Sequence, residues 1–303
     1  MAGLAAAGAF GRLTARRRAP SPGAHGGLWN NPGWAWRTSA PAGKPPAVRN
    51  GILVLYEYPF NESIRTMLRL EHLFDRLGQL LPRDAAVDHH FALATLFEII
   101  EVASRSDLKS DLLKELERHK AQFMAWRNNP AVEQGALDRT IGRLESAFQQ
   151  LNQQAGKAGQ ALAGHEWLSS VRSRIAIPGG TCEFDLPAYH AWQQREASRR
   201  RADLMAWVST LAPLAEGLQL LLQLVRETGV PHRVITQGGQ FQQSLPQGRS
   251  YQLLRLRIDP APDLVPEITC HRLMVGVRMM RVDEEGRLRP AGADTAFELA
   301  LCG

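Results

Sequence analysis

The sequence has few cysteines, no long apolar segment and, over its first fifty residues, no acidic side chain. Its three cysteines, Cys182, Cys270 and Cys302, include no pair in CxxC spacing, which excludes a zinc ribbon and a disulfide framework. The most apolar run, residues 214–225, is interrupted by polar residues and is too short to span a bilayer. We therefore expect a protein of a reducing compartment with no direct membrane insertion.

The positive charge of the chain is concentrated at its beginning. Residues 1–50 carry seven of the 36 basic residues, so the rest of the chain holds 29 basic and 30 acidic residues, although the whole has a formal charge of +6. A nucleic-acid-binding protein, the alternative function that this charge suggests, needs its basic surface on the folded part. The near-neutral body argues against that alternative, and we expect no nucleic-acid partner.

Residues 1–51 are rich in Ala, Gly, Pro and Arg and show no apolar period. Such a composition buries too little surface to offset the entropy of ordering, so we expect a disordered basic tail or an over-long gene start. The ordered pattern begins abruptly at Ile52, which favours initiation near Leu53 or Val54. A targeting peptide is the third interpretation, because an acid-free Arg/Ala segment resembles an organellar transit peptide.

The pattern from residue 52 to about 228 predicts a mainly α-helical domain with one initial strand. Residues 52–58 alternate as a strand does and are stopped by Pro59. Asn61 is expected to cap a helix that runs to about Leu81. Apolar spacing predicts further helices over 86–103, 108–126, from Pro130 to about 162, 166–175, 187–209 and 214–225, the last capped by Gly229.

After residue 230 the apolar period changes from 3.6 to 2, which predicts a smaller antiparallel β-domain over 230–302. The expected strands cover 234–236, 241–245, 251–258, 268–282 and 295–301. Strands clustered after helices indicate the α+β class, with a helical bundle domain followed by a sheet. The first short strand is expected to join the C-terminal sheet.

The sequence shows no catalytic constellation, so we expect no catalytic residue, no metal and no cofactor. Gly238 and Gly239 lie among strands with no helix after them, which disfavours a dinucleotide site. The adjacent His89 and His90 are expected on an exposed helix face rather than at a metal. An enzyme using a Cys182 nucleophile is a second alternative, with His190 as its base, but no orienting group or oxyanion donors are apparent, and a small buried thiol is favoured.

One helix carries a stripe of cations. Arg65, Arg69, His72 and Arg76 are spaced i, i+4, i+7 and i+11, which places all four on one face. Spacing alone favours a solvated face beside the core. The functional interpretation is an anion-binding groove, for which arginine is suited because its planar guanidinium can hold a carboxylate through two parallel hydrogen bonds.

Further arginines fall where the chain turns toward the predicted sheet and on its strands. In the strand over 251–258, Arg255 and Arg257 are expected on one face, opposite Leu256. The triplet at 199–201 winds around its helix and is expected to be solvated. The other arginines of interest are Arg172, Arg174, Arg272 and Arg278.

Several motifs of the chain are similar to those of the ZapD family of bacterial cell division proteins. The likeness covers about residues 52–302 in order and with no large gap. The motifs that carry it are YEYP at 56–59, LRLE at 68–71, LLKEL at 112–116, IPGGTCEFDLP at 177–187 and FELA at 297–300. The IPGG-to-FDLP segment is the most specific of them.

This resemblance implies a cytoplasmic, non-enzymatic factor at the mid-cell division site. Members of the family bind the tubulin-like GTPase FtsZ, work as symmetric homodimers, and crosslink and bundle FtsZ protofilaments to promote Z-ring assembly. The family fold is a helical domain plus a β-domain, and a basic pocket is thought to hold the C-terminal tail of FtsZ.

By position, the resemblance assigns Arg65, Arg69 and His190 to that pocket. On charge alone the predicted site also includes His72, Arg76, Arg172, Arg255, Arg272 and Arg278. There is one departure from the family pattern. Glu166 stands where some relatives have an arginine, twelve residues before the proline of the IPGG segment, so a pocket contact is lost there or supplied by another residue.

Overall fold

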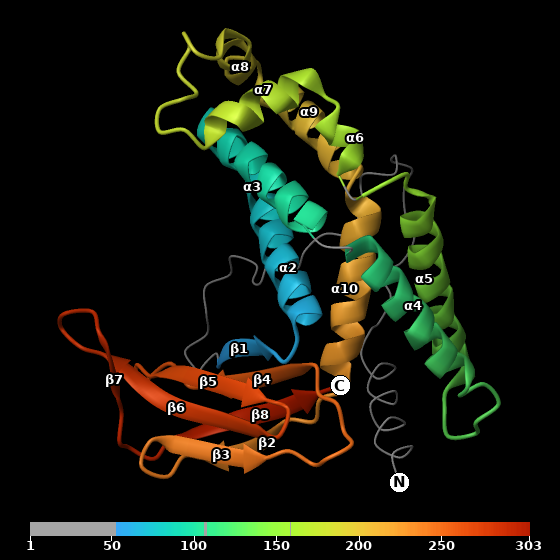
Figure 1. The fold of residues 1–303 in the computed structure, drawn as a ribbon, viewed down its shortest axis with the longest axis vertical. Helices are drawn as coiled ribbons and strands as arrows, with labels where there is room; N and C mark the ends of the chain where they lie inside the picture. Colours follow the sequence, from blue (N-terminus) through green and yellow to red (C-terminus); the bar gives the residue numbers. More distant parts are fainter. Residues whose placement is uncertain (1–52, 106–107, 158) are drawn as a thin grey trace, which may run out of the picture. The chain divides into compact units, whose positions relative to one another are not determined.

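The computed structural model describes residues 53–105, 108–157 and 159–303; the predicted tail over 1–51 lies outside them. The helices and strands of the described chain are labelled in Figure 1. In chain order they are β1(Val54–Pro59), α2(Glu62–Leu80), α3(Ala86–Arg105), α4(Leu108–Met124), α5(Gln134–Gln153), α6(Gln160–Ala163), α7(Glu166–Ile175), α8(Pro187–Gln193), α9(Ala197–Ser209), α10(Ala212–Glu227), β2(His232–Ile235), β3(Gln240–Ser244), β4(Leu253–Ile258), β5(Val265–His271), β6(Met274–Val282), β7(Leu288–Pro290) and β8(Ala296–Cys302).

The described chain divides into two compact units. The sheet unit contains residues 53–65 and 222–303, and the helical unit contains the described residues from 66 to 221. The division falls within α2 and within α10, so each of these helices begins in one unit and ends in the other. Helices followed by antiparallel strands make up the α+β fold, as the sequence predicts.

The sheet unit holds two antiparallel sheets (Figure 1). The strand order is β1-β4-β8-β2 in the first sheet and β3-β6-β5 in the second, where β7 also pairs with β6. β1 pairs with β4 along its whole length, from Val54 opposite Ile258 to Pro59 opposite Leu253. The prediction that the first strand joins the C-terminal sheet is therefore confirmed.

The core of the sheet unit draws on both sheets. Leu254 and Leu256 of β4 belong to the same buried cluster as Val277 of β6. Because successive side chains of a strand point to opposite faces, the residues between them point away from this core. Arg255 and Arg257 therefore share the outer face of the first sheet, as predicted.

α2 begins at the predicted side-chain cap. Oδ1 of Asn61 accepts a hydrogen bond from the backbone N–H of Ile64 at 2.8 Å. This contact satisfies one of the donors that the first turn of a helix leaves free. Glu62 in the same turn adds a negative charge near the positive end of the helix dipole.

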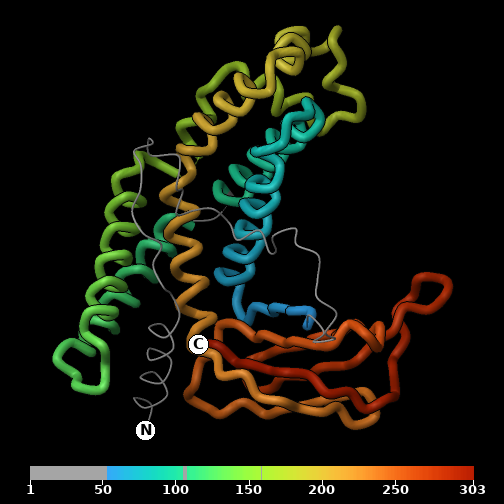
Figure 2. The backbone as a smooth tube through the Cα atoms, turned by 180° about the vertical axis from the view of Figure 1, so that it is seen from behind, coloured from blue at the N-terminus to red at the C-terminus, as the bar shows by residue number. Residues whose placement is uncertain are grey.

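The helical unit packs α4, α5 and the start of α10 together. α4 and α5 lie side by side (Figure 2), as the short link between them predicts. A Cβ added at Gly217 of α10 would lie 3.7 Å from Leu116 of α4 and 3.8 Å from Leu151 of α5. Leu214 and Leu218 are fully buried, which confirms that α10 is a core helix.

Two predicted helices are each divided in the structure. The helix expected to reach residue 162 ends at Gln153, and α6 follows only after Gly156 and Gly159, whose φ angles are 68° and 77°. These left-handed conformations cannot continue a right-handed helix. The helix expected over 187–209 is interrupted at 194–196 and forms α8 and α9.

The strand predicted over 268–282 is a hairpin. The chain reverses at Arg272 and Leu273, between β5 and β6, and His271 stands opposite Met274. No Gly, Pro, Asn or Asp marks this turn, so the sequence reads as one continuous alternating run. The short strand β7 was not predicted.

Gly229 follows α10 as predicted, but its role is to allow close packing. A Cβ at this position would lie 2.4 Å from Sγ of Cys302 and 3.3 Å from Cβ of Ala300. Only a residue without a side chain lets the chain after α10 approach β8 this closely. Burial raises the pKa of the Cys302 thiol to about 11, so this cysteine is an inert packing residue.

α4 buries a histidine that the sequence gives no reason to single out. His119 is buried beside Phe123, and its Nε2 lies 3.3 Å from Nη2 of Arg118. A guanidinium can only donate, so Nε2 accepts and the ring is neutral. Burial, together with the Arg118 charge, lowers the pKa of His119 from 6.5 to about 4.

This histidine is expected to make the protein less stable in mild acid. Between about pH 6.5 and pH 4 the unfolded chain binds a proton at His119 that the folded chain does not, so folding weakens as the pH falls. We expect His119→Leu to reduce the loss of unfolding free energy between pH 7 and pH 5 by about 2 kcal/mol. Urea denaturation at both pH values measures this, with the exposed His232→Leu as control. Equal pH dependence of the two variants would contradict the prediction.

Candidate partner-binding site

The nine predicted site residues are divided between the two units. The sheet unit holds four of them, namely Arg65, Arg255, Arg272 and Arg278. The helical unit holds the other five, namely Arg69, His72, Arg76, Arg172 and His190. The surroundings of each set decide which side chains are accessible to a partner.

The cationic stripe of α2 combines exposed and half-buried side chains. Arg69 and His72 are exposed, whereas Arg65 and Arg76 are half-buried. Nε of Arg65 lies 3.2 Å from Oε2 of Glu62, in an exposed pair of the kind that contributes little stability. Its guanidinium also lies 5.9 Å from the centre of the Tyr58 ring.

Arg76 connects two helices of the helical unit. Its Nε donates a hydrogen bond to Oγ1 of Thr95 at 2.9 Å, and its Nη2 lies 2.6 Å from Oε1 of Glu98. Both partners belong to α3. The position of Arg76 in the stripe therefore serves the packing of α2 against α3, and Arg69 and His72 are the exposed part of the stripe.

Arg255 is part of an ion-pair network in the sheet unit. The carboxylate of Glu57 accepts two hydrogen bonds from Arg226, at 2.9 and 2.6 Å, and one from Nε of Arg255 at 2.9 Å. The Glu57 side chain is only 14% exposed. We call these three residues the Glu57 network; neither Glu57 nor Arg226 is among the predicted site residues, because no local signal links positions so far apart in the chain.

The two arginines of the second sheet differ in their engagement. Nη1 of Arg278 lies 3.7 Å from Oε2 of Glu267 on the neighbouring strand, and both side chains are about half exposed. Arg272 is exposed in the β5–β6 turn, and the described residues include no ion-pair partner for it. Arg278 alternates with the buried Val277 and Met279, so it lies on the outer face of the second sheet, opposite in direction to Arg255.

In the helical unit, the predicted residues flank the segment between α7 and α8. Arg172 is exposed in the last turn of α7, where the helix dipole stabilises a positive charge. Within the described chain its side chain makes no hydrogen bond or ion pair. His190 is exposed on α8. The segment between them exposes Ile177 and Phe184, the latter to 79%.

The predicted glycine turn in this segment is confirmed. Gly179 has a φ of 70°. A Cβ at Gly180 would lie 2.7 Å from the carbonyl oxygen of Arg174, so the second glycine is required by close backbone approach. The ion pair of Arg174 with Asp185 at 3.5 Å joins the two ends of the segment.

His89 is buried, so its predicted exposed position is wrong. Its Nδ1 accepts a hydrogen bond from Nε of Arg200 at 2.9 Å, and burial lowers its pKa. Arg200 also donates to the carbonyl oxygens of Gln193, Arg195 and Asp84. Arg200 is therefore an interior residue that satisfies backbone carbonyls at the α8–α9 break and in the link between α2 and α3. The prediction of a solvated triplet is wrong for it.

An aromatic cluster joins the same helices. Nδ1 of His90 lies 2.7 Å from the Tyr189 hydroxyl, and burial lowers the pKa of His90. Trp167 packs against Trp192 and Trp207, with ring centres 5.5 and 5.3 Å apart. His90 is thus half-buried and engaged rather than on an exposed face.

The cysteine expected to be buried is partly exposed. Cys182 is half-buried, and in the described chain no hydrogen bond connects it to His190. Cys270 is also half-buried, and burial raises its pKa to about 12. A raised pKa disfavours the thiolate, so Cys270 is a poor nucleophile.

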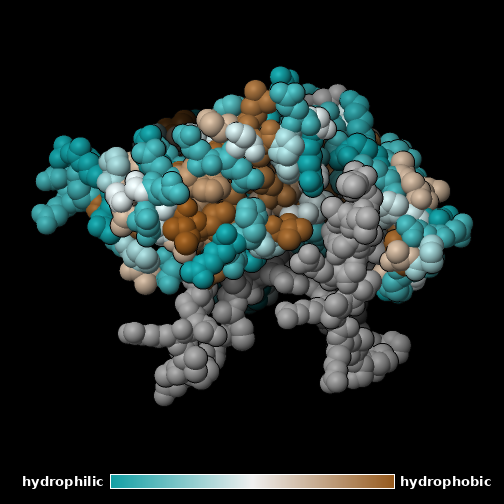
Figure 3. All heavy atoms as spheres, turned by 90° about the horizontal axis from the view of Figure 1, so that it is seen from below, coloured by the Kyte–Doolittle hydropathy of each residue, from teal (hydrophilic) through white to brown (hydrophobic). Residues whose placement is uncertain are grey.

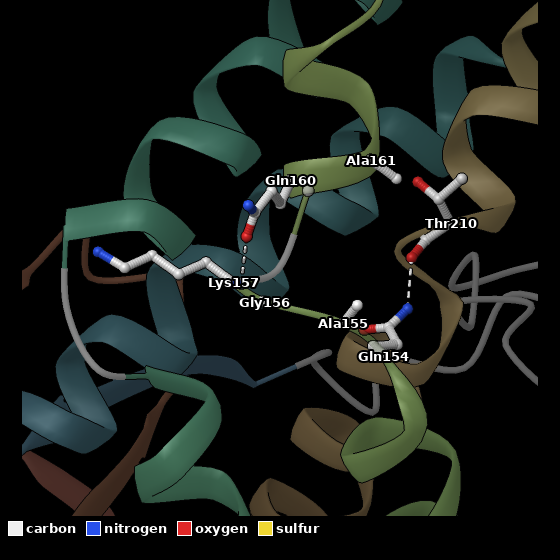
Figure 4. A pocket seen from close by; sticks show the side chains of 8 residues that line it. Gln154, Ala155, Gly156, Lys157, Gln160, Ala161 and Thr210 are labelled. Carbon is white, nitrogen blue, oxygen red and sulfur yellow. Dashed lines mark hydrogen bonds between the residues drawn. The ribbon is translucent and has the colours of Figure 1, made fainter.

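A cleft of about 370 Å³ lies in the helical unit (Figure 4). It is lined by the link between α5 and α6, by the start of α6 and by Thr210, which follows α9. Gln154 donates to the carbonyl oxygen of Thr210 at 2.7 Å, and Gln160 accepts from the backbone N–H of Lys157 at 3.0 Å. Its eight lining residues include no carboxylate, histidine or cysteine. Among the described residues the cleft therefore offers Lys157 but no carboxylate, imidazole or thiol to act with it in acid–base or nucleophilic chemistry.

In the described part of the chain, no group of three or more His, Cys, Asp or Glu side chains is placed to hold a metal ion. In the same part of the chain no single helix is long and apolar enough to cross a bilayer; α9 and α10 pass that test only together, with a bend of 64° between them. Figure 3 shows one face of the molecule, on which hydrophobic patches are interspersed with hydrophilic residues.

Comparison with known proteins identifies one family. Residues 68–278 match the family described as ZapD, a cell division protein. The Cell division protein ZapD of Cupriavidus necator is 53% identical over 251 residues, which is 82% of this chain and 99% of the relative. Proteins of the same name from Cupriavidus pinatubonensis and Ralstonia pickettii are 52% and 51% identical over the same shares.

Proposed function

This chain belongs to the ZapD family of cell division proteins, and on that basis we propose that it binds the C-terminal tail of FtsZ and bundles FtsZ protofilaments. The family membership carries the proposal. The exposed arginines Arg69, Arg172 and Arg272 support it, with the exposed His72 beside Arg69, because their side chains reach the surface where an acidic peptide would bind.

Such a peptide would bind each site weakly. An exposed ion pair contributes about 0.2 to 1 kcal/mol, so single-site binding near the micromolar range, about −8 kcal/mol, is expected. Bundling then depends on multivalency. A symmetric homodimer presents two equal sites, and an FtsZ polymer presents many tails, so the second engagement is effectively intramolecular and raises avidity about 10²- to 10⁴-fold.

We propose that the protein acts without catalysis, in the cytoplasm and at the mid-cell division site, where it promotes Z-ring assembly. The cleft chemistry agrees with a binding role, since its described lining carries no acid–base pair.

The rival nucleic-acid function predicts a gel shift with the chain starting at Val54, whereas the proposed function predicts none.

The α2 stripe provides the first test. We expect Arg65→Ala with Arg69→Ala to weaken co-sedimentation with FtsZ filaments at low salt about fivefold, because two cations that face the acidic tail are removed. Added salt should weaken wild-type bundling as well, since exposed charges are screened.

The matched control is Arg127→Ala with Arg139→Ala, two exposed arginines elsewhere in the helical unit. This variant should co-sediment as the wild type does. FtsZ without its tail should not be bundled. If tailless FtsZ were bundled equally well, or if both double variants behaved alike, the tail-binding proposal would be wrong.

A further inference from the structure

A row of side chains crosses the outer face of the first sheet in register. Leu55 of β1, Arg257 of β4, Glu298 of β8 and Arg233 of β2 stand opposite one another. Arg257 and Glu298 alternate with buried core residues, and Tyr56 and Val234, next to Leu55 and Arg233, pack against the same core. Because side chains alternate along a strand, the four side chains of the row point to the opposite, outer face. We call Arg257, Glu298 and Arg233 the outer row; the strands that carry them are adjacent in Figure 1.

Of the two arginines of the outer row, only Arg257 pairs with the carboxylate of Glu298. Nη1 of Arg257 lies 3.7 Å from Oε2 of Glu298, and the two side chains are 41% and 42% exposed. Arg233 is exposed, and within the described residues its side chain has no hydrogen-bond or ion-pair partner. Since an exposed pair at this distance contributes little, both guanidinium groups remain accessible to another anion.

The surroundings of the outer row are positive and partly apolar. The Glu57 network lies on the same face and adds two arginines and one glutamate, so the face carries a net charge of +2. Leu55 is 41% exposed at the β1 end, and Ile235 is 59% exposed at the β2 end. A ligand lying across the strands would meet Leu55 on β1, then an arginine on each side of Glu298, with Ile235 beside Arg233 on the edge strand β2.

We propose that the outer row binds a short acidic peptide that also carries apolar residues, as an additional contact site for the partner's tail. This inference rests on the proposed function. Arg257 and Arg233 are two strand spacings apart, roughly 10 Å, and alternate residues of an extended peptide are about 7 Å apart, a difference that long arginine side chains can span. Glu298 between them disfavours one multiply charged phosphate and favours two separate carboxylates.

Three variants of the full chain test the outer row by fluorescence anisotropy. The probes are a labelled peptide of the FtsZ C-terminal tail and a labelled, unrelated peptide rich in Glu and Leu. Arg233→Gln with Arg257→Gln should raise the Kd of both probes about fivefold. Glu298→Gln removes the negative charge between the arginines and should lower both Kd values about threefold.

The matched control is Arg281→Gln with Arg287→Gln, two exposed arginines elsewhere in the sheet unit. It removes the same charge and should leave both Kd values within twofold of wild type. Thermal melts of all variants check that the fold is unchanged. Shifts of opposite sign for the arginine and glutamate variants support the outer row.

The outcomes separate this inference from the proposed function. If the wild type binds the FtsZ tail and the outer-row variants match the control, the outer row is overturned and the proposed function stands. If the wild type does not bind the FtsZ tail, the proposed function fails. The outer row is then tested with the unrelated peptide rich in Glu and Leu. Opposite shifts of its Kd in the arginine and glutamate variants support the outer row, and Kd values equal to that of the control variant overturn it.

Discussion

Glu57→Ala is expected to lower the free energy of unfolding by about 3 kcal/mol at pH 7. The carboxylate accepts hydrogen bonds from both Arg226 and Arg255 and is 14% exposed, while each arginine side chain is 22% exposed. Removing it leaves two half-buried guanidinium groups close together without their counter-charge. The alanine variant therefore loses three charge-assisted hydrogen bonds and gains a like-charge repulsion.

Urea denaturation of the full chain measures this change, and Glu267→Ala is its matched control. Glu267 is also a cross-strand partner of an arginine, Arg278, but at 3.7 Å and with both side chains 51% exposed. Its removal should cost less than about 1 kcal/mol. An equal effect of the two substitutions would show that the Glu57 network does not hold the sheet unit together.

The same network qualifies the predicted role of Arg255. Because its guanidinium is bound to Glu57, Arg255→Ala should change stability and partner binding together. Binding measured on that variant is informative only alongside its urea denaturation curve. Arg257, two residues further along β4, has a weaker partner and is the better probe of the outer face.

Gly239→Ala is expected to lower the free energy of unfolding by about 3 kcal/mol or more. Gly239 has a φ of 76°, and a Cβ there would lie 1.6 Å from the carbonyl oxygen of Ala291. The backbone cannot move away easily, since Gly239 accepts a hydrogen bond from the N–H of Met279 at 2.8 Å and Ala291 donates one to the carbonyl oxygen of Met279 at 2.8 Å. The cost combines left-handed strain with a collision between backbones.

The adjacent glycine provides the control. Gly238 also has a left-handed φ, 56°, but nothing lies within 4 Å of a Cβ added there. Gly238→Ala should therefore cost only the strain of the left-handed conformation, about 1 to 2 kcal/mol. Urea midpoints, or the soluble yield if Gly239→Ala fails to fold, compare the two; similar losses would contradict the role of the Ala291 contact.

Local signals in the sequence were reliable where they describe the chain's own neighbours. The Asn61 cap, the Gly179 turn and the two faces of β4 all follow from residues within a few positions of one another. The β5–β6 turn at Arg272 and Leu273 was missed because no turn residue marks it. There the pairing of two strands, which is a tertiary contact, overrides the continuous apolar period.

The buried polar residues were the hardest to predict. His89 and Arg200 are 111 positions apart, and each satisfies the other's hydrogen bond in the interior of the helical unit. Taken singly, a histidine on a helix and an arginine in a basic triplet both indicate a surface. Their burial is possible because folding brings the two side chains together, and the hydrogen bond between them offsets the free-energy cost of removing each from water.

The sequence by itself determined the α+β class, the joining of the first strand to the C-terminal sheet and, through its motifs, membership of the ZapD family. Periodicity and motifs are local, so a single chain is enough to read them. The tertiary structure decided which arginines are engaged and which are accessible, because an ion pair such as Glu57 with Arg226 depends on residues 169 positions apart. The sequence shows how many arginines there are and how they are spaced. Only the packed structure shows whether a carboxylate already neutralises a given arginine.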